Sequence, residues 1–218
     1  MAGLYQQKAD TYESVRLRMV KTQIIARGIH NPAVLEAMKK VPRHLFVPIE
    51  YRDEAYNDYP LPIGYNQTIS QPYIVAYMTD VLNPGPKMKA LEIGTGSGYQ
   101  AAILAEIVDR VYTIEIVPEL ARESAERLEK MGYRNITGKY GDGYQGWKEY
   151  APFDIIIVTA APESIPQPLI DQLAENGKMV IPVGKPSSVQ ELQLITKKNG
   201  KAVIKRLTFV RFVPFQRL

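Results

Sequence analysis

The feature that most constrains the fold is a regular alternation of strand-like and helix-like segments between residues 89 and 184. The strand-like runs are KALEI at 89–93, RVYTIE at 110–115, ITGKY at 136–140, FDIIIVTA at 153–160 and KMVIPVG at 178–184. Three intervening segments have the apolar spacing of helices: 97–108, 118–132 and 166–177. Such alternation is typical of a doubly wound α/β fold, in which helices cover a mostly parallel sheet.

The end of the chain predicts an addition to this sheet. Two strand-like runs, 190–196 and 202–215, are joined at Asn199-Gly200, a dipeptide typical of hairpin turns. We therefore expect an antiparallel C-terminal hairpin strand in a sheet of seven strands. The expected fold class is a Rossmann-like α/β domain with an N-terminal helical extension.

The first part of the chain is predicted to be mainly helical. Helical spacing occurs in 15–25, 31–41 and 71–82, and the proline- and glycine-containing stretch 58–70 predicts an irregular loop. We divide the chain as a single domain, 1–218, in which 1–86 form the helical extension with its loop and 87–218 form the α/β core.

Composition excludes several kinds of site. The chain has no cysteine and only two histidines, His30 and His44, which rules out disulfides and thiolate chemistry and argues against a metal cluster. The formal charge of +4 is mild and the basic residues are scattered, so we expect no nucleic-acid surface. No apolar stretch approaches the ~20 residues of a membrane span, and the polar start lacks the apolar centre of a secretory signal. We expect a cytoplasmic protein that does not contact membranes.

Glycines at alternate positions mark a candidate ligand site. Gly94, Gly96 and Gly98 follow the first strand-like run, where ligands of open α/β sheets bind, and a residue without Cβ lets backbone N–H groups approach a ligand. The spacing is neither that of a phosphate-binding loop nor the G-x-G-x-x-G of dinucleotide-binding proteins. Glu92, two residues before the loop, would repel a pyrophosphate but suits a ligand with ammonium and sulfonium groups.

Carboxylates also follow the next two strand-like runs. Glu115 ends RVYTIE, where its carboxylate can accept hydrogen bonds from both hydroxyls of an adenosine ribose. NAD would need the same residue, so Glu115 does not distinguish the two cofactors. The alternative is a carboxylate that is simply exposed at the end of a strand. Asp142, in Gly141-Asp142-Gly143, can accept a hydrogen bond from an adenine amino group, and Gly143 permits close approach. The alternative for this tripeptide is a simple turn.

The three strand ends together, EIGTGSG, YTIE and GDG, resemble those of S-adenosylmethionine-dependent methyltransferases of the doubly wound class. The absence of cysteine excludes methylation at cytosine C5, and FDIIIVTA continues into APESIP where amino-group methylases carry [DN]PP[YF], which favours an oxygen acceptor. The resemblance implies that S-adenosylmethionine binds, and S-adenosylhomocysteine is released, at Glu92, Gly94, Thr95, Gly96, Ser97, Gly98, Glu115, Asp142 and Gly143.

Segments along nearly the whole chain resemble protein-L-isoaspartate O-methyltransferases: VPRHLFVP at 41–48, PLPIGYNQTISQPYIVA at 60–76, GDGYQGW at 141–147 and VRFVPF at 210–215. The resemblance implies methyl transfer to the free α-carboxylate of L-isoaspartyl residues in damaged proteins and peptides, giving an ester that collapses to a succinimide. It also assigns Ser70 to catalysis and assigns Gln67, Thr68 and Ile69 to the wall of the cofactor or substrate site. From the composition we expect no metal. We expect a monomer.

The chemistry of this reaction asks little of the protein's acids and bases. An α-carboxyl group has an ordinary pKa of roughly 3.5 and is already anionic at neutral pH, so both histidines can be structural. Catalysis then depends on aligning oxygen, methyl carbon and sulfur and on excluding water. Ser70 can donate its hydroxyl to the acceptor carboxylate, and the alternative is that it only caps the following helix.

Two further functions are compatible with the sequence. A nicotinamide-dependent oxidoreductase would also use the glycine loop and Glu115. A catalytically silent module that binds peptide or RNA would keep the cofactor site and lack turnover.

Overall fold

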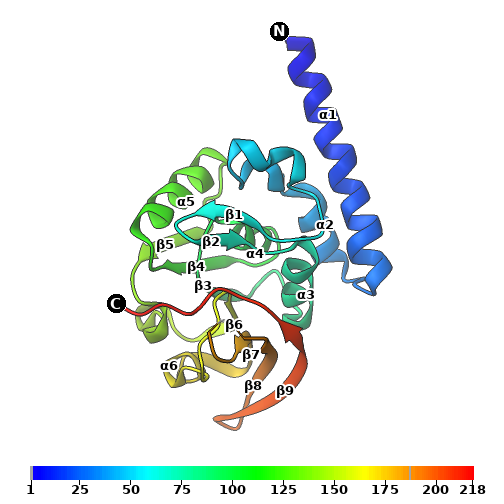
Figure 1. The fold of residues 1–218 in the computed structure, drawn as a ribbon. Helices are drawn as coiled ribbons and strands as arrows, with labels where there is room; N and C mark the ends of the chain where they lie inside the picture. The colour runs from blue at the N-terminus through cyan, green and yellow to red at the C-terminus, as the bar shows by residue number, and fades with distance from the viewer. Residues whose placement is uncertain (1, 187) are drawn as a thin grey trace.

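The computed structural model describes residues 2–186 and 188–218, and within these residues seven strands form one mixed sheet in the order β5-β4-β3-β6-β7-β8-β9 (Figure 1). β3 to β7 are parallel, and β8 is antiparallel to both β7 and β9. The bounds are β3 Lys89–Ile93, β4 Arg110–Glu115, β5 Ile136–Tyr140, β6 Phe153–Val158, β7 Leu173–Val183, β8 Gln190–Lys198 and β9 Lys201–Val210. The predicted fold class is confirmed.

Alternate residues of the central strands enter two different cores, because successive side chains of a strand point to opposite faces. Ala90 of β3 and Ile157 of β6 belong to the larger core, whereas their neighbours Leu91 and Ile156 belong to the smaller one. Both faces of these strands are covered, which explains their nearly continuous apolar sequence. The helices are α2 Pro32–Lys40, α3 Pro72–Leu82, α4 Tyr99–Ala105, α5 Pro118–Lys130 and α6 Gln167–Asp171.

The N-terminal region contacts the larger core from the end of helix α1 onward. Helix α1, Ala2–Met19, stands away from the body of the molecule over much of its length and continues into a π-helical turn, Val20–Ile24 (Figure 1). Met19, Val20 and Ile24 are buried with α2 and α3. Within the described residues, none of the helices has the length and apolarity that crossing a membrane would require.

The stretch 58–70 is not an irregular loop, as predicted, but contains a short antiparallel hairpin. β1, Leu61–Gly64, pairs with β2, Gln67–Ile69, across a turn in which Tyr65 and Asn66 both have positive φ. The sequence pattern did not indicate this hairpin, because the stretch contains prolines and its turn is Tyr-Asn, which is not a usual hairpin dipeptide. Its inner side chains, Leu61, Ile63 and Ile69, are buried against the core, so the loop is held firmly.

Two other predicted boundaries were wrong. The helix predicted over 166–177 ends at Asp171, because Leu173 pairs with Phe153 of β6 and enters the smaller core. Within β7 the backbone at Asn176 has φ of +64°, and the pairing with β6 shifts register between Leu173 and Lys178. The strand-like run 202–215 also ends early, at Val210, and the remaining residues leave the sheet.

The C-terminal segment crosses the carboxyl ends of the parallel strands (Figure 1). The Ala161 N–H donates to the Val213 carbonyl at 2.9 Å, and the Phe215 N–H donates to the Ala161 carbonyl at 3.0 Å. Arg217 forms an ion pair with Asp142, which follows β5, at 2.8 Å. These contacts bring 213–217 over the region where the predicted site residues gather.

Candidate active site

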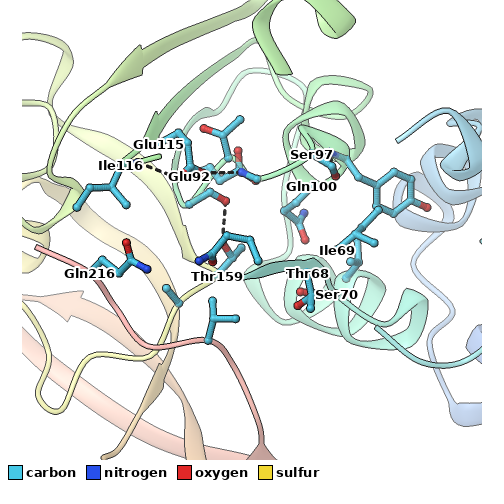
Figure 2. A pocket seen from close by; sticks show the side chains of 18 of the residues that line it. Thr68, Ile69, Ser70, Glu92, Ser97, Gln100, Glu115, Ile116, Thr159 and Gln216 are labelled. Atoms are coloured by element: carbon cyan, nitrogen blue, oxygen red, sulfur yellow. Dashed lines mark hydrogen bonds between the residues drawn. The ribbon is translucent and has the colours of Figure 1, made fainter. Parts of the chain in front are cut away.

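A pocket opens at the carboxyl ends of β3, β4 and β6, and Figure 2 shows Ser70 and Thr68 across it from Glu115 and Ile116. This is the position where parallel α/β sheets bind ligands. Ten of the predicted residues line it: Gln67, Thr68, Ile69, Ser70, Glu92, Gly94, Thr95, Gly96, Ser97 and Glu115. The hairpin β1–β2 and the glycine loop, far apart in the sequence, thus form opposite walls of one site.

The glycine loop is shaped by contacts that a larger residue would prevent. Gly94 has φ of +93°, and a Cβ there would lie 2.4 Å from the Thr159 hydroxyl oxygen. The Gly94 N–H donates to the Ile114 carbonyl at 2.8 Å, and its own carbonyl accepts from the Thr159 hydroxyl at 2.7 Å. Gly98, with φ of +87°, is the N-cap residue before helix α4 and does not line the pocket. The loop is therefore pinned to β4 and β6 on both sides.

Glu115 is buried at the end of β4 and anchors the backbone around it. One oxygen, Oε2, accepts the Gly96 N–H at 2.7 Å, and Oε1 accepts the Ile116 and Val117 N–H groups at 2.9 Å each. The alternative that Glu115 is an exposed strand-end carboxylate is wrong, because its exposed fraction is 4%. A carboxylate has about four acceptor sites, so this one keeps one free toward the pocket.

Glu92 is fully buried beside the pocket and is only half satisfied. Its Oε2 accepts the Thr113 hydroxyl at 2.5 Å, whereas its Oε1 has no hydrogen-bond partner among the described residues. Burial raises the pKa of Glu92 to about 8, with a further rise from the Glu115 charge and opposing effects of the Thr113 hydroxyl and the Ala101 N–H. An unpartnered buried carboxyl oxygen is costly, and a cation at this point would relieve it.

The charge of the pocket is one-sided. Two carboxylates, Glu92 and Glu115, line it, and none of the described lining residues is a lysine, arginine or histidine. The guanidinium of Arg127, on α5, donates to the Ser97 carbonyl at 2.8 Å. A ligand with positive charge fits this electrostatic setting, and a pyrophosphate does not.

Ser70 lies between β2 and α3 and is not the cap of that helix. The residue at the N-cap position of α3 is Gln71, which makes no side-chain capping bond, and Pro72 is the first helical residue. The Ser70 hydroxyl makes no hydrogen bond within the described part of the chain, so the capping alternative is wrong. Ser70 also lines a neighbouring cavity of about 430 Å³ together with Thr159, Phe209 and Arg211. Its hydroxyl is free to meet a ligand that enters from there.

A family model described as Protein-L-isoaspartate(D-aspartate) O-methyltransferase (PCMT) matches residues 16–217. The chain belongs to this family. A protein-L-isoaspartate O-methyltransferase of Picosynechococcus sp. is 58% identical over 95% of this chain and 93% of its own, and one of Gloeobacter violaceus is 57% identical over 91% and 97%. These relatives match in length as well as in sequence.

Solved structures agree with the family assignment. A Plasmodium falciparum structure assigned to the protein-L-isoaspartate O-methyltransferases, in complex with S-adenosyl-L-homocysteine, has a TM-score of 0.80 at 30% identity and covers 95% of this chain and 99% of that one. A second protein-L-isoaspartate O-methyltransferase structure has a TM-score of 0.81 at 26% identity, and the match covers 93% of this chain but 65% of that longer chain.

In this member of the isoaspartate methyltransferase family, three predicted cofactor residues, Gly98, Asp142 and Gly143, lie outside the main pocket. Gly143 lines a smaller cavity that shares Gly94 with it, and Gly143 packs so closely that a Cβ would lie 2.3 Å from Ile93. Asp142 lines neither cavity: its Oδ1 accepts the Tyr144 N–H at 2.9 Å, and its Oδ2 accepts from Arg217. The free protein therefore uses Asp142 to fix the turn and the C-terminal segment.

The sequence reasoning missed the part of the site that the C-terminal segment contributes. Val213, Pro214 and Gln216 line the main pocket, and Thr159, at the end of β6, lies between it and the neighbouring cavity. The family resemblance of VRFVPF was the only signal, because nothing in its local pattern says that these residues cross the sheet. Arg211, within the same segment, lines the neighbouring cavity.

His44 and the single tryptophan lie in packed surroundings, whereas His30 is exposed. His44 Nδ1 lies 2.7 Å from the Tyr56 hydroxyl, and the His44 ring stacks on Tyr12. Trp147 packs edge-on against Tyr112 and Tyr150 in the smaller core region. Among the described residues, no group of three or more His, Asp or Glu side chains is placed to hold a metal ion.

Proposed function

We propose that this chain is a protein repair methyltransferase, which transfers a methyl group from S-adenosylmethionine to the free α-carboxylate of L-isoaspartyl residues in damaged proteins and peptides. The observation that carries the proposal is the pocket itself. Two buried carboxylates lie on one side without a cationic side chain among the described lining residues, and on the other side lies Ser70, whose hydroxyl has no hydrogen bond within the described part of the chain. A cationic cofactor fits one wall, and an anionic acceptor fits the other.

The residues present fit the cofactor. The unpartnered Oε1 of Glu92 suits an ammonium group, and the free acceptor site of Glu115 suits one ribose hydroxyl. The glycine loop would pass close beneath the cofactor, with Thr95, Ser97 and Gln67–Ile69 around it. When bound, S-adenosylmethionine supplies a methyl group carried by a positively charged sulfur. Both oxygens of Asp142 already accept hydrogen bonds, from the Tyr144 N–H and from Arg217. Its contact with the adenine amino group stays a prediction, and it would have to be made in addition to these two bonds.

The acceptor side is built to hold a carboxylate in place. Ser70 would donate its hydroxyl to one carboxylate oxygen, and the first N–H groups of the eleven-residue helix α3 favour negative charge nearby. Because the acceptor is already ionised at neutral pH, no residue needs to remove a proton. The protein therefore contributes to catalysis by aligning the reacting atoms and by excluding water. The hairpin β1–β2 and the C-terminal segment cover the pocket and would exclude water from it.

The nicotinamide alternative loses support on the same observation, because a pyrophosphate would face two carboxylates without a cation. The silent binding module differs from an enzyme only in turnover. Our expectations of a cytoplasmic monomer that does not bind nucleic acid, and of a division at residue 86, stay predictions. The larger core contains residues from both sides of that division, which supports one domain.

The deciding experiment is methyl transfer from labelled S-adenosylmethionine to two peptides that differ only in an isoaspartyl or a normal aspartyl residue. We expect base-labile methyl ester on the isoaspartyl peptide alone. Label on neither peptide, with S-adenosylhomocysteine still bound, would overturn the repair function and favour the silent module. Tight NADH binding without binding of S-adenosylhomocysteine would overturn the cofactor assignment as well.

A further inference from the structure

A buried chain of hydrogen bonds lies behind the pocket and is not explained by the functions given above. The hydroxyl oxygens of Thr95 and Thr113 are 2.6 Å apart, and the Thr113 hydroxyl lies 2.5 Å from Glu92 Oε2. The exposed fractions of Thr95, Thr113 and Glu92 are 6%, 1% and 0%. Thr113 lies in the middle of β4, directly opposite Glu92 of β3 in the sheet register, and it does not line the pocket.

The direction of these hydrogen bonds follows from the number of protons. A hydroxyl has one proton to donate, and Thr113 donates it to Glu92 Oε2. Thr113 must therefore accept the proton of Thr95, and a protonated Glu92 carries its own proton on Oε1. The chain therefore runs from Thr95 through Thr113 to Glu92 Oε2. It holds one oxygen of Glu92 inside the sheet and leaves Oε1 as the oxygen without a partner.

We propose that Thr113 is a positioning residue that orients the Glu92 carboxyl group toward the cofactor's ammonium, and that binding of this ammonium expels the proton that Glu92 carries in the free protein. The inference rests on the proposed function, because it needs a cofactor with an ammonium group. The O–H bond at Glu92 breaks, its proton passes to the solvent buffer, and the ammonium takes the proton's place beside the oxygen.

The surroundings of Glu92 favour its protonated form until a cation arrives. From β4 the Glu115 carboxylate acts on it with the same charge, from α4 the Ala101 N–H acts in the opposite sense, and from β6 its register neighbour is the apolar Ile157. Farther out, Arg127 of α5 is engaged by the Ser97 carbonyl, and Arg217 pairs with Asp142. Burial keeps the pKa of Glu92 at about 8, so the group is mostly protonated at pH 6.5.

Calorimetric titration in two buffers of different ionisation enthalpy measures the protons released on binding. Two probes separate the ammonium from the rest of the cofactor: S-adenosylhomocysteine, and 5′-methylthioadenosine, which keeps adenosine and sulfur but has no ammonium or carboxylate. At pH 6.5 we expect the wild-type protein to release about one proton per S-adenosylhomocysteine and none per 5′-methylthioadenosine. Glu92→Gln should release none with either probe.

The variant Thr113→Val tests positioning, since it keeps the shape of threonine and removes the hydroxyl. We expect S-adenosylhomocysteine affinity to fall roughly tenfold or more, as for loss of a hydrogen bond to a charged group, and 5′-methylthioadenosine affinity to stay within about twofold. The gain in S-adenosylhomocysteine affinity with rising pH should also begin at a higher pH than in the wild type. Thr113→Ser should restore both properties. Thr196→Val, at a half-buried sheet position on β8, is the matched control and should behave as wild type.

Three results would overturn the inference: a wild-type protein that binds S-adenosylhomocysteine without releasing protons, a Glu92→Gln variant that still releases them, or a Thr113→Val variant that loses affinity equally for both probes. The last would show a merely structural role, and a Thr113→Val variant that fails to fold leaves the first two results to decide. Methyl transfer without proton release would refute this inference and keep the proposed function. Failure to bind S-adenosylhomocysteine at all would remove both.

Discussion

Replacing Glu115 by glutamine separates its two proposed tasks, which are to anchor the glycine loop and to bind the cofactor's ribose. The carboxylate accepts three backbone N–H groups, two at Oε1 and the one of Gly96 at Oε2. A glutamine side chain of the same size has only one acceptor oxygen. If that oxygen takes the Oε1 position, the amide nitrogen lies against the Gly96 N–H, donor facing donor.

The expected cost follows from these bonds. One charge-assisted hydrogen bond is lost in a buried site, and a donor is left without a partner, which together amount to about 2–3 kcal/mol of unfolding free energy. For a chain of this size the melting temperature of the free protein should fall by roughly 4–12 °C. Loss of the ribose acceptor should weaken cofactor binding by about 10- to 100-fold, equivalent to about 1.4–2.8 kcal/mol.

Calorimetry of the free protein gives the first quantity, and titration with S-adenosylhomocysteine and 5′-methylthioadenosine gives the second. Both probes contain the ribose, so Glu115→Gln should weaken both alike, unlike Thr113→Val. The exposed Glu163 offers a control, and Glu163→Gln should change neither quantity. An unchanged melting temperature would refute the anchoring role, and unchanged affinity for both probes would refute the ribose assignment.

Three further predictions follow from the same geometry. Ser70→Ala should lower kcat for isoaspartyl peptides by about tenfold or more and leave S-adenosylhomocysteine affinity within about twofold, and an unchanged kcat would exclude contact with the acceptor. Gly94→Ala should lower the unfolding free energy by about 2–4 kcal/mol, because of its positive φ and the contact with Thr159, whereas Gly85→Ala, with its nearest neighbour 3.8 Å away, should be neutral in the same thermal melts. Burial, and after it the positive charges of Arg16 and Arg52, lower the pKa of His44 to about 4. The unfolded chain, in which His44 has its ordinary pKa of about 6.5, therefore binds a proton more tightly than the folded protein, and the free energy of unfolding falls as pH falls from 6.5 toward 4. Urea unfolding at pH 7 and pH 5 should therefore show a smaller pH effect in His44→Phe than in the wild type, and equal effects would contradict this assignment.

Much of the candidate site could be predicted because its residues lie at strand ends. The carboxyl ends of parallel strands meet at one edge of a sheet, so EIGTGSG and YTIE had to come together once the alternating pattern was recognised. The contact between the Gly96 N–H and Glu115 is a direct consequence of that arrangement. The Asn199-Gly200 hairpin was equally predictable, because both residues take the positive φ that this dipeptide favours.

Other features could not be predicted from local pattern. The hairpin of 61–69 depends on burial of three side chains, Leu61, Ile63 and Ile69, in the larger core. The end of α6 depends on Leu173 pairing with β6. Ser70 illustrates the same limit: its position before a helix suggested capping, and only the backbone shows that Gln71 occupies the cap position.

The alternating α/β core, the glycine loop and the carboxylates that follow its strands are encoded locally, because periodicity and strand-end position are properties of short stretches of chain. Three features depend on the folded arrangement of the described residues: Glu92 Oε1 lacks a partner, Thr113 holds Oε2, and the C-terminal segment completes the pocket. Hydrogen-bond satisfaction and burial arise between segments distant in sequence. They are fixed only when the sheet brings those segments together.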